Sequence, residues 1–509
     1  LIQRENSMDI HISVRNLVEF ILRSGDIDNR KAVAPENAMQ EGSRIHRMIQ
    51  RRMGSDYHAE VSLQYLYETE NYRILIDGRA DGIIDATQSN GNMVTIDESK
   101  GTYREIHRIK EAQQVHLAQA SCYAYFYAKQ QELSVIRIRI TYCNMETEEL
   151  KYFHYEYTIR ELENWFMEII NSYRRWADFQ YEWQSLRQQS VRQLVFPCPY
   201  REGQKELVTY VYQTIYHRKK LFIEAPTGVG KTISTVFPSI KAIGEGKGQR
   251  IFYLTAKTIT RTVANDTLEL LRKQMLRLKS VTLTAKDKIC FMEETECNPV
   301  DCPYAKGHFD RINDAIYDLL IHEDNFSREK IEEYAARHKV CPFEMSLDMS
   351  LFADMIICDY NYLFDPHVYL KRFFSEGVRE DYIFLIDEAH NLVDRGREMY
   401  SATLQKEEFL GLKKVVKDYD LHIYRLLERC NKELLELKRL CDEYVCWEEE
   451  DIAPFVRGVI RLSEAIDNYL EDHEDSPVRK ELLEFYFKLS HFLMIHELLD
   501  DHYEIYSQY

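Results

Sequence analysis

The sequence predicts an α/β protein, and three of its features support that fold class. Two apolar segments, 220–223 and 382–386, each run directly into a short polar motif of the kind found at the ends of parallel strands. Near the amino terminus, two segments of alternating apolar residues, 76–85 and 93–100, each deliver acidic side chains to one end. A chain of 509 residues is too long for one core, and its length suggests about three or four domains.

The first motif is a phosphate-binding loop that follows the apolar segment 220–223. Gly228 and Gly230 allow the backbone amides to curl around a phosphate chain, and the segment from Ile233 predicts a helix behind them. Lys231 reaches the β and γ oxygens of a bound nucleotide, and the Thr232 hydroxyl completes the shell of a Mg²⁺ ion. We therefore expect ATP and Mg²⁺ at this loop, although Ala225 stands where the first glycine of the usual pattern belongs.

The second motif, Asp-Glu-Ala-His, follows the apolar segment 382–386. Hydrolysis of a nucleoside triphosphate needs an acid for the metal ion and a base that orients the attacking water. Asp387 suits the first role and Glu388 the second, while His390 is placed to sense the γ-phosphate. Because both motifs occur in the expected order, each after an apolar strand, we predict an ATPase rather than a chance match.

Composition sets the limits for these expectations. No apolar run reaches the roughly 18 residues that a membrane span needs, and the first residues lack a secretory apolar core, so we expect a cytoplasmic protein without a membrane partner. A net charge of −18 argues against global attraction to nucleic acid, but the acids are unevenly spread and local grooves can still be basic. Disulfides are not expected among eleven cytosolic cysteines.

Four of the cysteines lie between the two ATPase motifs, three of them beside prolines or in loops. They are Cys290, Cys297, Cys302 and Cys341. Their spacing lacks the tight pairs typical of zinc sites and fits no common ferredoxin pattern. The spacing by itself leaves a metal centre and four unrelated thiols as open alternatives.

The region 196–395 as a whole resembles the iron–sulfur DNA helicases of the XPD/DinG type. Six landmarks stand in that family's order: Tyr200–Gln204, the phosphate loop, Tyr253–Thr258, the four cysteines, Ile357–Tyr362 and the Asp-Glu-Ala-His motif. The resemblance implies a RecA-like parallel-sheet lobe with a [4Fe–4S] cluster on the four cysteines, in an insertion at about 286–345. It also implies 5′→3′ translocation along DNA that is single-stranded or has a single-stranded tail.

The same resemblance assigns roles to residues around the nucleotide and the DNA. Gln204 is expected to contact adenine, with Arg201 nearby. Thr255, Lys257 and Thr258 are expected to approach the DNA backbone, a role for which a lysine beside hydroxyls is physically suited. The alternative for these three residues is an ordinary polar strand end.

The amino-terminal acids predict a second active site. If 76–85 and 93–100 are adjacent strands, Asp81 lies beside Glu98, and Lys100 lies two residues further on the same face. Two carboxylates and a lysine suit phosphodiester hydrolysis, which needs a metal ion to activate water and a cation near the attacking oxygen. The alternative is a common acidic turn between hairpin strands.

With His46 upstream and Gln119 and Tyr123 downstream, the segment resembles the RecB-type PD-(D/E)XK nucleases. That likeness implies a nuclease-like α/β domain in which His46, Asp81 and Glu98 bind Mg²⁺ or Mn²⁺. Lys100 assists catalysis, and Gln119 and Tyr123 position the nucleic acid strand. The acid before x-Lys is a glutamate here, where the family usually has an aspartate.

Three parts are therefore expected along the chain. They are a nuclease-like domain at 8–185, a helicase lobe at 196–395 and a truncated helical arch region at 396–509, with a linker at 188–195. Apolar residues that repeat at three and four, as in 426–437, predict helices in the last region, and the resemblance to the helicases implies that these helices form an arch domain. Since no second ATPase lobe follows, we expect the chain to be the amino-terminal part of a longer enzyme.

The combined prediction is an ATP-dependent DNA helicase fused to a metal-dependent nuclease that acts in DNA repair or processing. Two alternatives stay open. In one, the chain is a non-catalytic subunit that binds nucleotide and DNA. In the other, the nuclease is the working enzyme and the helicase portion only targets it.

Overall fold

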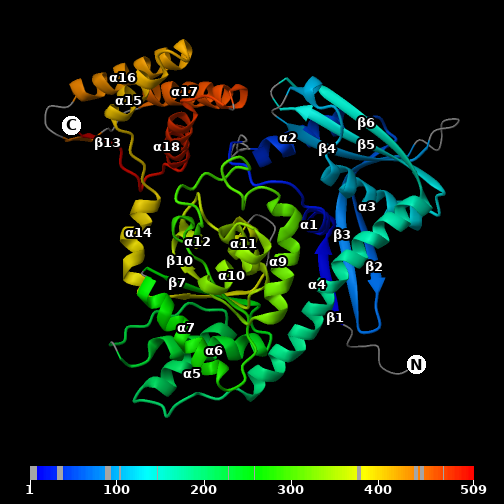
Figure 1. The fold of residues 1–509 in the computed structure, drawn as a ribbon, viewed down its shortest axis with the longest axis vertical. Coiled ribbons are helices and arrows are strands. Elements are labelled where there is room, and N and C mark those ends of the chain that lie inside the picture. Colours follow the sequence, from blue (N-terminus) through cyan, green and yellow to red (C-terminus); the bar gives the residue numbers. More distant parts are fainter. Residues whose placement is uncertain are drawn as a thin grey trace.

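The computed structural model describes residues 8–30, 38–85, 93–102, 105–145, 147–226, 228–256, 258–374, 380–440, 445–447, 452–473 and 475–508. Two α/β bodies and a helical region make up the molecule (Figure 1). The amino-terminal body lies on one side, the central lobe on the other, and the carboxyl-terminal helices lie above the lobe. None of the helices in these ranges is long and apolar enough to cross a bilayer.

The amino-terminal body is built on a six-stranded sheet in the order β1-β3-β4-β5-β6, with β2 also paired to β3. Its strands are β1 (Met8–Ser13), β2 (Tyr57–Glu68), β3 (Tyr72–Ile84), β4 (Thr95–Thr102), β5 (Val135–Asn144) and β6 (Leu150–Thr158). Its helices are α1 (Val14–Ile21), α2 (Ala38–Arg52), η1 (Ile106–Arg108), α3 (Gln114–Gln130) and α4 (Ile159–Gln193). The strand β3 pairs in antiparallel fashion with β4, as the two acidic segments predicted.

The central lobe has a five-stranded parallel sheet in the order β11-β7-β10-β8-β9. Its strands are β7 (Arg250–Thr255), β8 (Ser280–Thr282), β9 (Asn325–Phe326), β10 (Met355–Asp359) and β11 (Tyr382–Ile386). Its helices are α5 (Gln204–Tyr216), α6 (Lys231–Gly244), α7 (Thr258–Arg272), α8 (Lys286–Ile289), α9 (His308–His322), α10 (Arg328–His338), α11 (Pro342–Met349), η2 (Ser350–Phe352), α12 (Asn361–Phe364) and α13 (Lys371–Phe374). The insertion with the cysteines is therefore mainly helical.

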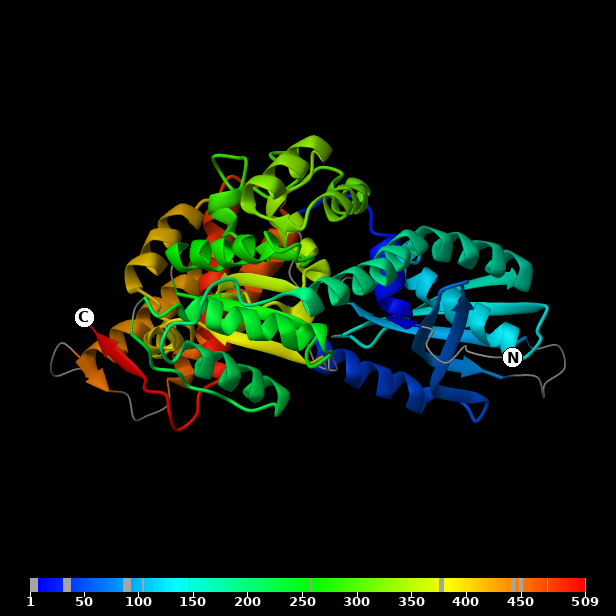
Figure 2. The same ribbon diagram turned by 90° about the horizontal axis from the view of Figure 1, so that it is seen from below.

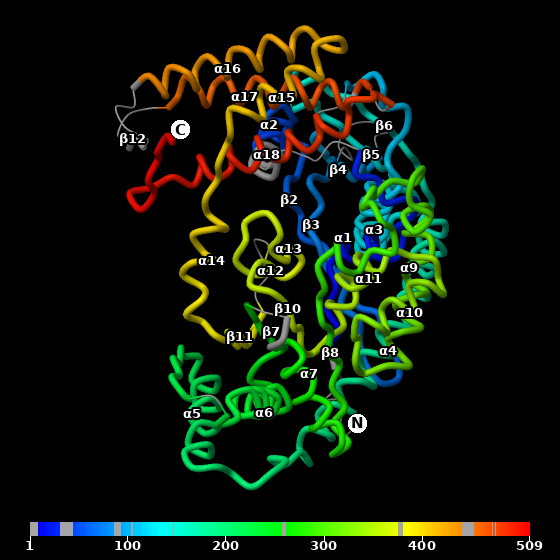
Figure 3. The backbone as a smooth tube through the Cα atoms, turned by 60° about the vertical axis from the view of Figure 1, so that its left-hand side comes forward, coloured from blue at the N-terminus to red at the C-terminus, as the bar shows by residue number. Residues whose placement is uncertain are grey.

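Beyond β11 the chain is helical, as its apolar spacing predicted. The elements are η3 (Ala389–Asn391), α14 (Leu392–Met399), α15 (Lys406–Val416), α16 (Leu421–Leu440), α17 (Ala453–Asp472) and α18 (Arg479–Glu497), with a small pair β12 (Val445–Trp447) and β13 (Tyr506–Gln508). In the tube view, α14 leads away from β11 towards the bundle of α15 to α18 (Figure 3). This bundle has a core of its own, centred on residues such as Phe409 and Leu462.

The expected linker at 188–195 is not a linker through most of its length, because α4 continues without a break to Gln193. This helix has 35 residues and is about 50 Å long at about 1.5 Å per residue. Its first part packs in the amino-terminal body, and its last part lies against the central lobe (Figure 2). The sequence prediction failed here because glutamine and serine suggested a loop, whereas Val191 is buried against α6 and holds the helix in place.

A cluster of polar contacts fastens the end of α4 to the lobe. Asp354, just before β10, accepts hydrogen bonds from the Trp183 indole at 3.1 Å and from the Lys279 backbone N–H at 2.9 Å, and forms an ion pair with Arg187. Asp354 is 4% exposed, so its charge is held by these partners rather than by water. The two α/β bodies are therefore joined by a helix that is part of both cores.

Candidate functional sites

The predicted amino-terminal site is formed by two neighbouring strands. Asp81 lies on β3, and Glu98 and Lys100 lie on β4. The backbone N–H of Ser99 donates to Asp81 Oδ2 at 2.8 Å, and Lys100 Nζ lies 2.7 Å from Glu98 Oε1. The strand pair thus brings the acids and the lysine to one place, as the spacing predicted.

Two helices supply the other three predicted side chains. His46 on α2 has its Nδ1 3.3 Å from Asp81 Oδ1. On α3, Gln119 accepts a hydrogen bond from Lys100 Nζ at 3.4 Å and donates to Tyr123 Oη at 3.4 Å. The six predicted residues therefore occupy one site.

The charges at this site are unbalanced. Glu98 is 1% exposed, and while Oε1 binds Lys100, the buried Oε2 has no hydrogen-bond partner in the described part of the chain. Burial, followed by the nearby charge of Asp81, raises the pKa of Glu98 to about 7. The hydrogen bond to Asp81 raises the pKa of His46, against the effect of its partial burial. A buried carboxylate oxygen without a donor is what a divalent cation would satisfy.

The site does not already have the form of a metal cage. Within the described ranges, no group of three or more His, Cys, Asp or Glu side chains is placed to hold a metal ion. Lys100 occupies one oxygen of Glu98, and His46 contacts Asp81 directly. The residue types and the unpartnered Oε2 of Glu98 fit Mg²⁺ or Mn²⁺.

A second layer, which the sequence reasoning did not find, stabilises the strand that carries Glu98. Asp97 is fully buried, and Arg139 binds both of its carboxylate oxygens at 2.8 Å. Thr141 donates to Asp97 at 2.7 Å, and Tyr57 donates to it at 3.2 Å. The sequence could have shown this second layer, because Asp97 and Glu98 are neighbours on one strand. Neighbours on a strand face opposite sides of the sheet, so only one of the two acids can join the site.

The phosphate-binding loop has the backbone that its glycines predict. Gly228 and Gly230 have φ of 84° and 79°, in the left-handed region, and α6 begins at Lys231. A side chain at position 230 would have its Cβ 2.6 Å from Gln204 Nε2. The loop and the start of a helix thus form the arrangement that favours an anion.

The acids of the second motif reach this loop. Lys231 Nζ lies 3.4 Å from Glu388 Oε1, and His390 Nδ1 lies 3.5 Å from Glu388 Oε2. Burial and the neighbouring charge of Glu388 raise the pKa of Asp387. Thr232 and Asp387 both interact with the Tyr253 hydroxyl, so the two expected magnesium ligands flank one side chain.

The two residues expected near adenine hold the loop in this structure. Gln204 is 4% exposed; its Nε2 donates to the Val229 carbonyl at 3.2 Å, and its Oε1 accepts from the Arg201 backbone N–H at 3.0 Å. The Arg201 guanidinium donates to the Gly228 carbonyl. Both side chains therefore contact the phosphate loop directly.

Two expectations around the nucleotide site need correction. Residues 220–223 form no strand; they are an exposed extended segment, and the Phe222 side chain is 91% exposed. In the described ranges β11 pairs with β7 alone, so this apolar segment lacks the sheet neighbour that would bury it. Thr255 is fully buried at the end of β7 with Arg261 Nε 3.5 Å from its hydroxyl, so it does not offer that hydroxyl to DNA. Lys257 lies outside the described residues, and Thr258 begins α7.

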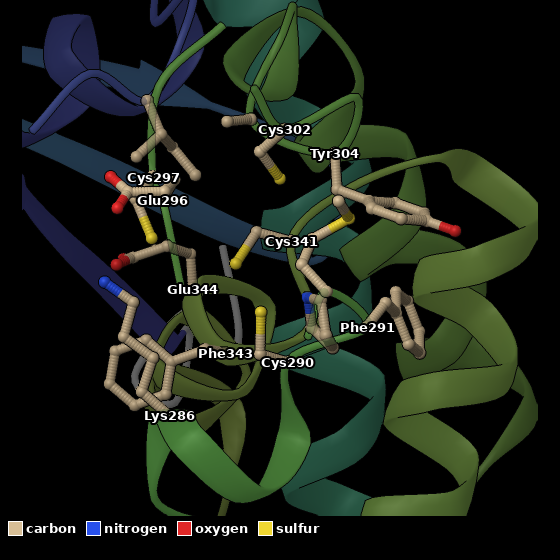
Figure 4. Close-up of a pocket in the computed structure, with 14 residues that line it drawn as sticks. Lys286, Cys290, Phe291, Glu296, Cys297, Cys302, Tyr304, Cys341, Phe343 and Glu344 are labelled. Carbon is tan, nitrogen blue, oxygen red and sulfur yellow. The ribbon is translucent and has the colours of Figure 1, made fainter. Parts of the chain in front are cut away.

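The four cysteines of the insertion line a single pocket (Figure 4). Cys290 follows the end of α8, Cys297 and Cys302 lie in the loop between α8 and α9, and Cys341 precedes α11. Their sulfur atoms face the same space. The pocket holds about 440 Å³ of empty space, part of it open to solvent.

The pocket suits a centre larger than one ion. Four thiolates around a single zinc ion would each lie about 2.3 Å from the metal, close to one another. Here no group of three or more ligating side chains in the described ranges is placed for a single ion, although the four sulfurs share the pocket. Burial raises the pKa of Cys341 to about 11, so a thiolate there needs a compensating positive charge. Four thiols that share one pocket are a donor set that an iron–sulfur cluster uses.

Comparisons with known protein families and with curated proteins give matches in the central region of the chain. Residues 202–299 match the family model described as DEAD/DEAH box helicase, and residues 270–409 match the model DEAD_2. The central part of the chain is therefore similar to DEAD/DEAH-box helicases. The ATP-dependent DNA helicase XPD of Sulfolobus acidocaldarius is 24% identical over 287 residues, which are 56% of this chain and 47% of that protein.

A second curated protein and a solved structure are also similar to parts of the chain. A probable ATP-dependent helicase of Methanocaldococcus jannaschii is 28% identical over 201 residues, covering 39% of this chain and 29% of that protein. A solved structure of an XPD helicase is similar over 59% of this chain and 51% of the solved chain, with 20% identity and a TM-score of 0.40. The chain thus spans about half or less of the length of these relatives.

Proposed function

We propose that this chain is part of an ATP-driven DNA helicase that carries a metal-dependent nuclease in the same polypeptide and acts in DNA repair or processing. The observation that supports the proposal is that two separate lysine–acid pairs form in one chain. One joins Lys231 to Glu388 at a phosphate loop, and the other joins Lys100 to Glu98 beside Asp81.

At the nucleotide site, the loop amides and Lys231 would bind the phosphates, and Thr232 and Asp387 would hold Mg²⁺. Glu388 is placed to orient water, since its other oxygen is within reach of His390. The related helicases support DNA as the partner, and by family likeness we propose 5′→3′ movement on a single strand. The acids and lysines supply positioning and charge, which is most of what phosphoryl transfer requires.

At the amino-terminal site, Asp81, Glu98 and His46 would hold Mg²⁺ or Mn²⁺, which when bound polarises a phosphate and lowers the pKa of a water molecule. Lys100 is held by Glu98 and Gln119 and is oriented towards the same space, where it stabilises negative charge on the phosphate. Tyr123 is anchored by Gln119 and packs beside Gly78 of β3, where it positions the DNA strand.

The cysteine pocket would hold a [4Fe–4S] cluster on its four thiolates. A lysine at the pocket wall supports a negatively charged centre, because it offsets the cost of burying thiolates. Lys286 lies in the pocket lining, and although its burial opposes a charge, its hydrogen bond to Cys297 raises its pKa. Protein purified without oxygen should be brown, with about four iron and four sulfide ions per chain. Stoichiometric zinc without visible absorption would contradict the cluster.

The motor is tested by ATP hydrolysis in the presence of single-stranded DNA. Lys231→Ala should reduce turnover by about 100-fold or more, the scale of losing one charge-stabilising group, while leaving the fold intact. Lys220→Ala is a matched control, because Lys220 is exposed and precedes the same loop. Equal turnover in the two variants would exclude the ATPase assignment and favour a non-catalytic nucleotide-binding subunit.

The nuclease is tested by cutting of single-stranded DNA in Mn²⁺ without ATP. Asp81→Ala, Glu98→Ala and Lys100→Ala should each abolish cutting. Asp77→Ala on the same strand β3 is the control, because Asp77 is exposed and outside the site. If cutting persists in Asp81→Ala, the amino-terminal body is a DNA-binding scaffold. If the wild-type chain cuts DNA but does not hydrolyse ATP, the helicase portion only targets a nuclease.

A further inference from the structure

A short segment of the amino-terminal body lies against the cysteine insertion. Residues 23–30, which we name the strap, follow α1 and run along the loops that carry two of the cysteines. The Asn29 backbone N–H donates to the Cys297 carbonyl at 2.8 Å, and the Ile27 backbone N–H donates to the Ala305 carbonyl at 3.0 Å. The strap therefore adds backbone hydrogen bonds on both sides of Cys302.

The strap also contributes a side chain to the pocket. Of the residues that line it, Ile27 comes from outside the insertion, and all the others lie between Lys286 and Glu344. Figure 4 shows the sulfur atoms facing a space whose rim includes apolar side chains such as Phe291 and Phe343. Ile27 extends this apolar rim, so the pocket wall is shared between two parts of the chain that are distant in sequence.

The strap is fixed at its amino-terminal end. Arg23 forms an ion pair with Asp348 at 2.6 Å and a hydrogen bond with Asn313 at 2.8 Å, both partly buried. Asn313 in turn donates to the Phe20 carbonyl at the end of α1 at 2.9 Å. Because Leu17 and Val18 of α1 are fully buried in the amino-terminal core, the strap is tied to that core rather than free to swing.

Further contacts bind the strap at the middle and at its other end. The Gly25 N–H donates to Asp310 at 2.9 Å, and the Gly307 N–H donates to Asp26 at 2.5 Å. At its end, the Arg479 side chain of α18 donates to the Arg30 carbonyl. The strap thus lies where the amino-terminal body, the insertion and the helical bundle meet.

We propose that the amino-terminal body closes the metal centre of the insertion, with Ile27 shielding the four cysteines from water and Asn29 fixing the loop of Cys297. This inference rests on the cluster assigned under the proposed function. The stability and potential of an iron–sulfur cluster depend on its exposure to solvent and on hydrogen bonds around the sulfurs. The strap gives the nuclease-like body a direct influence on both.

The test is carried out on the full chain purified without oxygen. Ile27→Ser places a polar group on the pocket wall, and the half-life of the visible absorption in air should fall by about 10-fold to 100-fold, the range seen for outer-shell partners of metal sites. Ile109→Ser is the control, because Ile109 is similarly half-buried in the same body but does not line the pocket. Arg23→Ala should give a smaller loss in the same direction, while Arg15→Ala on α1 should give none, since its ion pair with Glu19 is exposed.

A second measurement separates the strap from general destabilisation. Hydrogen exchange at the Ile27 and Asn29 amides should be slow in the iron-loaded protein and faster in Cys297→Ser, with no change in Cys430→Ser. Equal cluster lifetimes in Ile27→Ser and the wild type, or an equal loss in Ile109→Ser, would overturn the proposal while leaving the cluster itself in place. A wild-type protein without iron would instead overturn the cluster assignment, and this inference with it.

Discussion

The amino-terminal site and the nucleotide site differ in how far each is assembled without a ligand. Asp81, Glu98 and Lys100 lie on paired strands, and Asp97 and Arg139 hold the strand from behind. The loop with Lys231 instead follows an exposed segment that belongs to no strand, and its contact with Glu388 is 3.4 Å long between half-exposed groups. A site on paired strands is preorganised, whereas a site on a loop depends on its ligand for part of its order.

The strongest test of this comparison measures hydrogen exchange with each ligand. Mg²⁺ and a non-hydrolysable ATP analogue should markedly slow exchange around 220–232, because phosphate binding gives the loop amides partners. Mn²⁺ should change exchange in β3 and β4 little, since those amides are already paired. A larger change in β3 and β4 than in the loop would reverse the comparison.

A second prediction concerns the attachment of α4 that joins the two sites. Asp354→Ala leaves the half-buried Arg187 without its partner, and removing the buried member of such a pair costs up to about 3–5 kcal/mol of unfolding free energy. Asp314→Ala breaks only the exposed ion pair with Arg175 and should cost about 0–1 kcal/mol. Chemical denaturation of both variants provides the measurement. Similar small losses would mean that α4 does not unite the two bodies.

The smallest expected effect is a pH dependence near the amino-terminal site. Burial, then the charge of Lys100, lowers the pKa of His116 to about 4, so its ring is neutral in the folded protein. Between about 4 and the unfolded value of 6.5, the unfolded chain binds a proton that the folded chain does not, and stability falls as pH falls.

His116→Gln should reduce this loss of stability in acid, because it removes the titrating ring while retaining a polar group near Tyr142. Thermal melts at pH 7 and pH 5 would compare the variant with the wild type. An unchanged difference between the two pH values would show that other groups cause the acid sensitivity.

The sequence predicted local geometry better than the connections between the parts of the chain. Asp81, Glu98 and Lys100 were placed correctly, because alternation along a strand fixes which side chains share a face. The left-handed glycines and the helix after Lys231 also followed from local chemistry. Those features depend on a few neighbouring residues, which is why a single sequence suffices for them.

Long-range packing explains the failures. The strand expected at 220–223 needs a neighbour in the sheet, and apolar content alone does not show whether one is present. The linker expected at 188–195 is helical because Val191 meets Gly244, a contact between residues more than fifty positions apart. The strap was not foreseen, because hydrogen bonds such as that from Asn29 to Cys297 are made by the backbone and leave no side-chain pattern.

The unbroken helix α4 also sets the angular phase between the two α/β bodies. Each residue of an α-helix turns the chain by about 100° and advances it by about 1.5 Å. One residue inserted between Phe179 and Trp183 would therefore rotate the amino-terminal body around the helix axis and break the contacts of both Trp183 and the strap. Inserting seven residues, about two turns, would nearly restore the rotation but separate the bodies by about 10 Å. In this part of the chain, helical register takes the place that loop length has in a flexible tether.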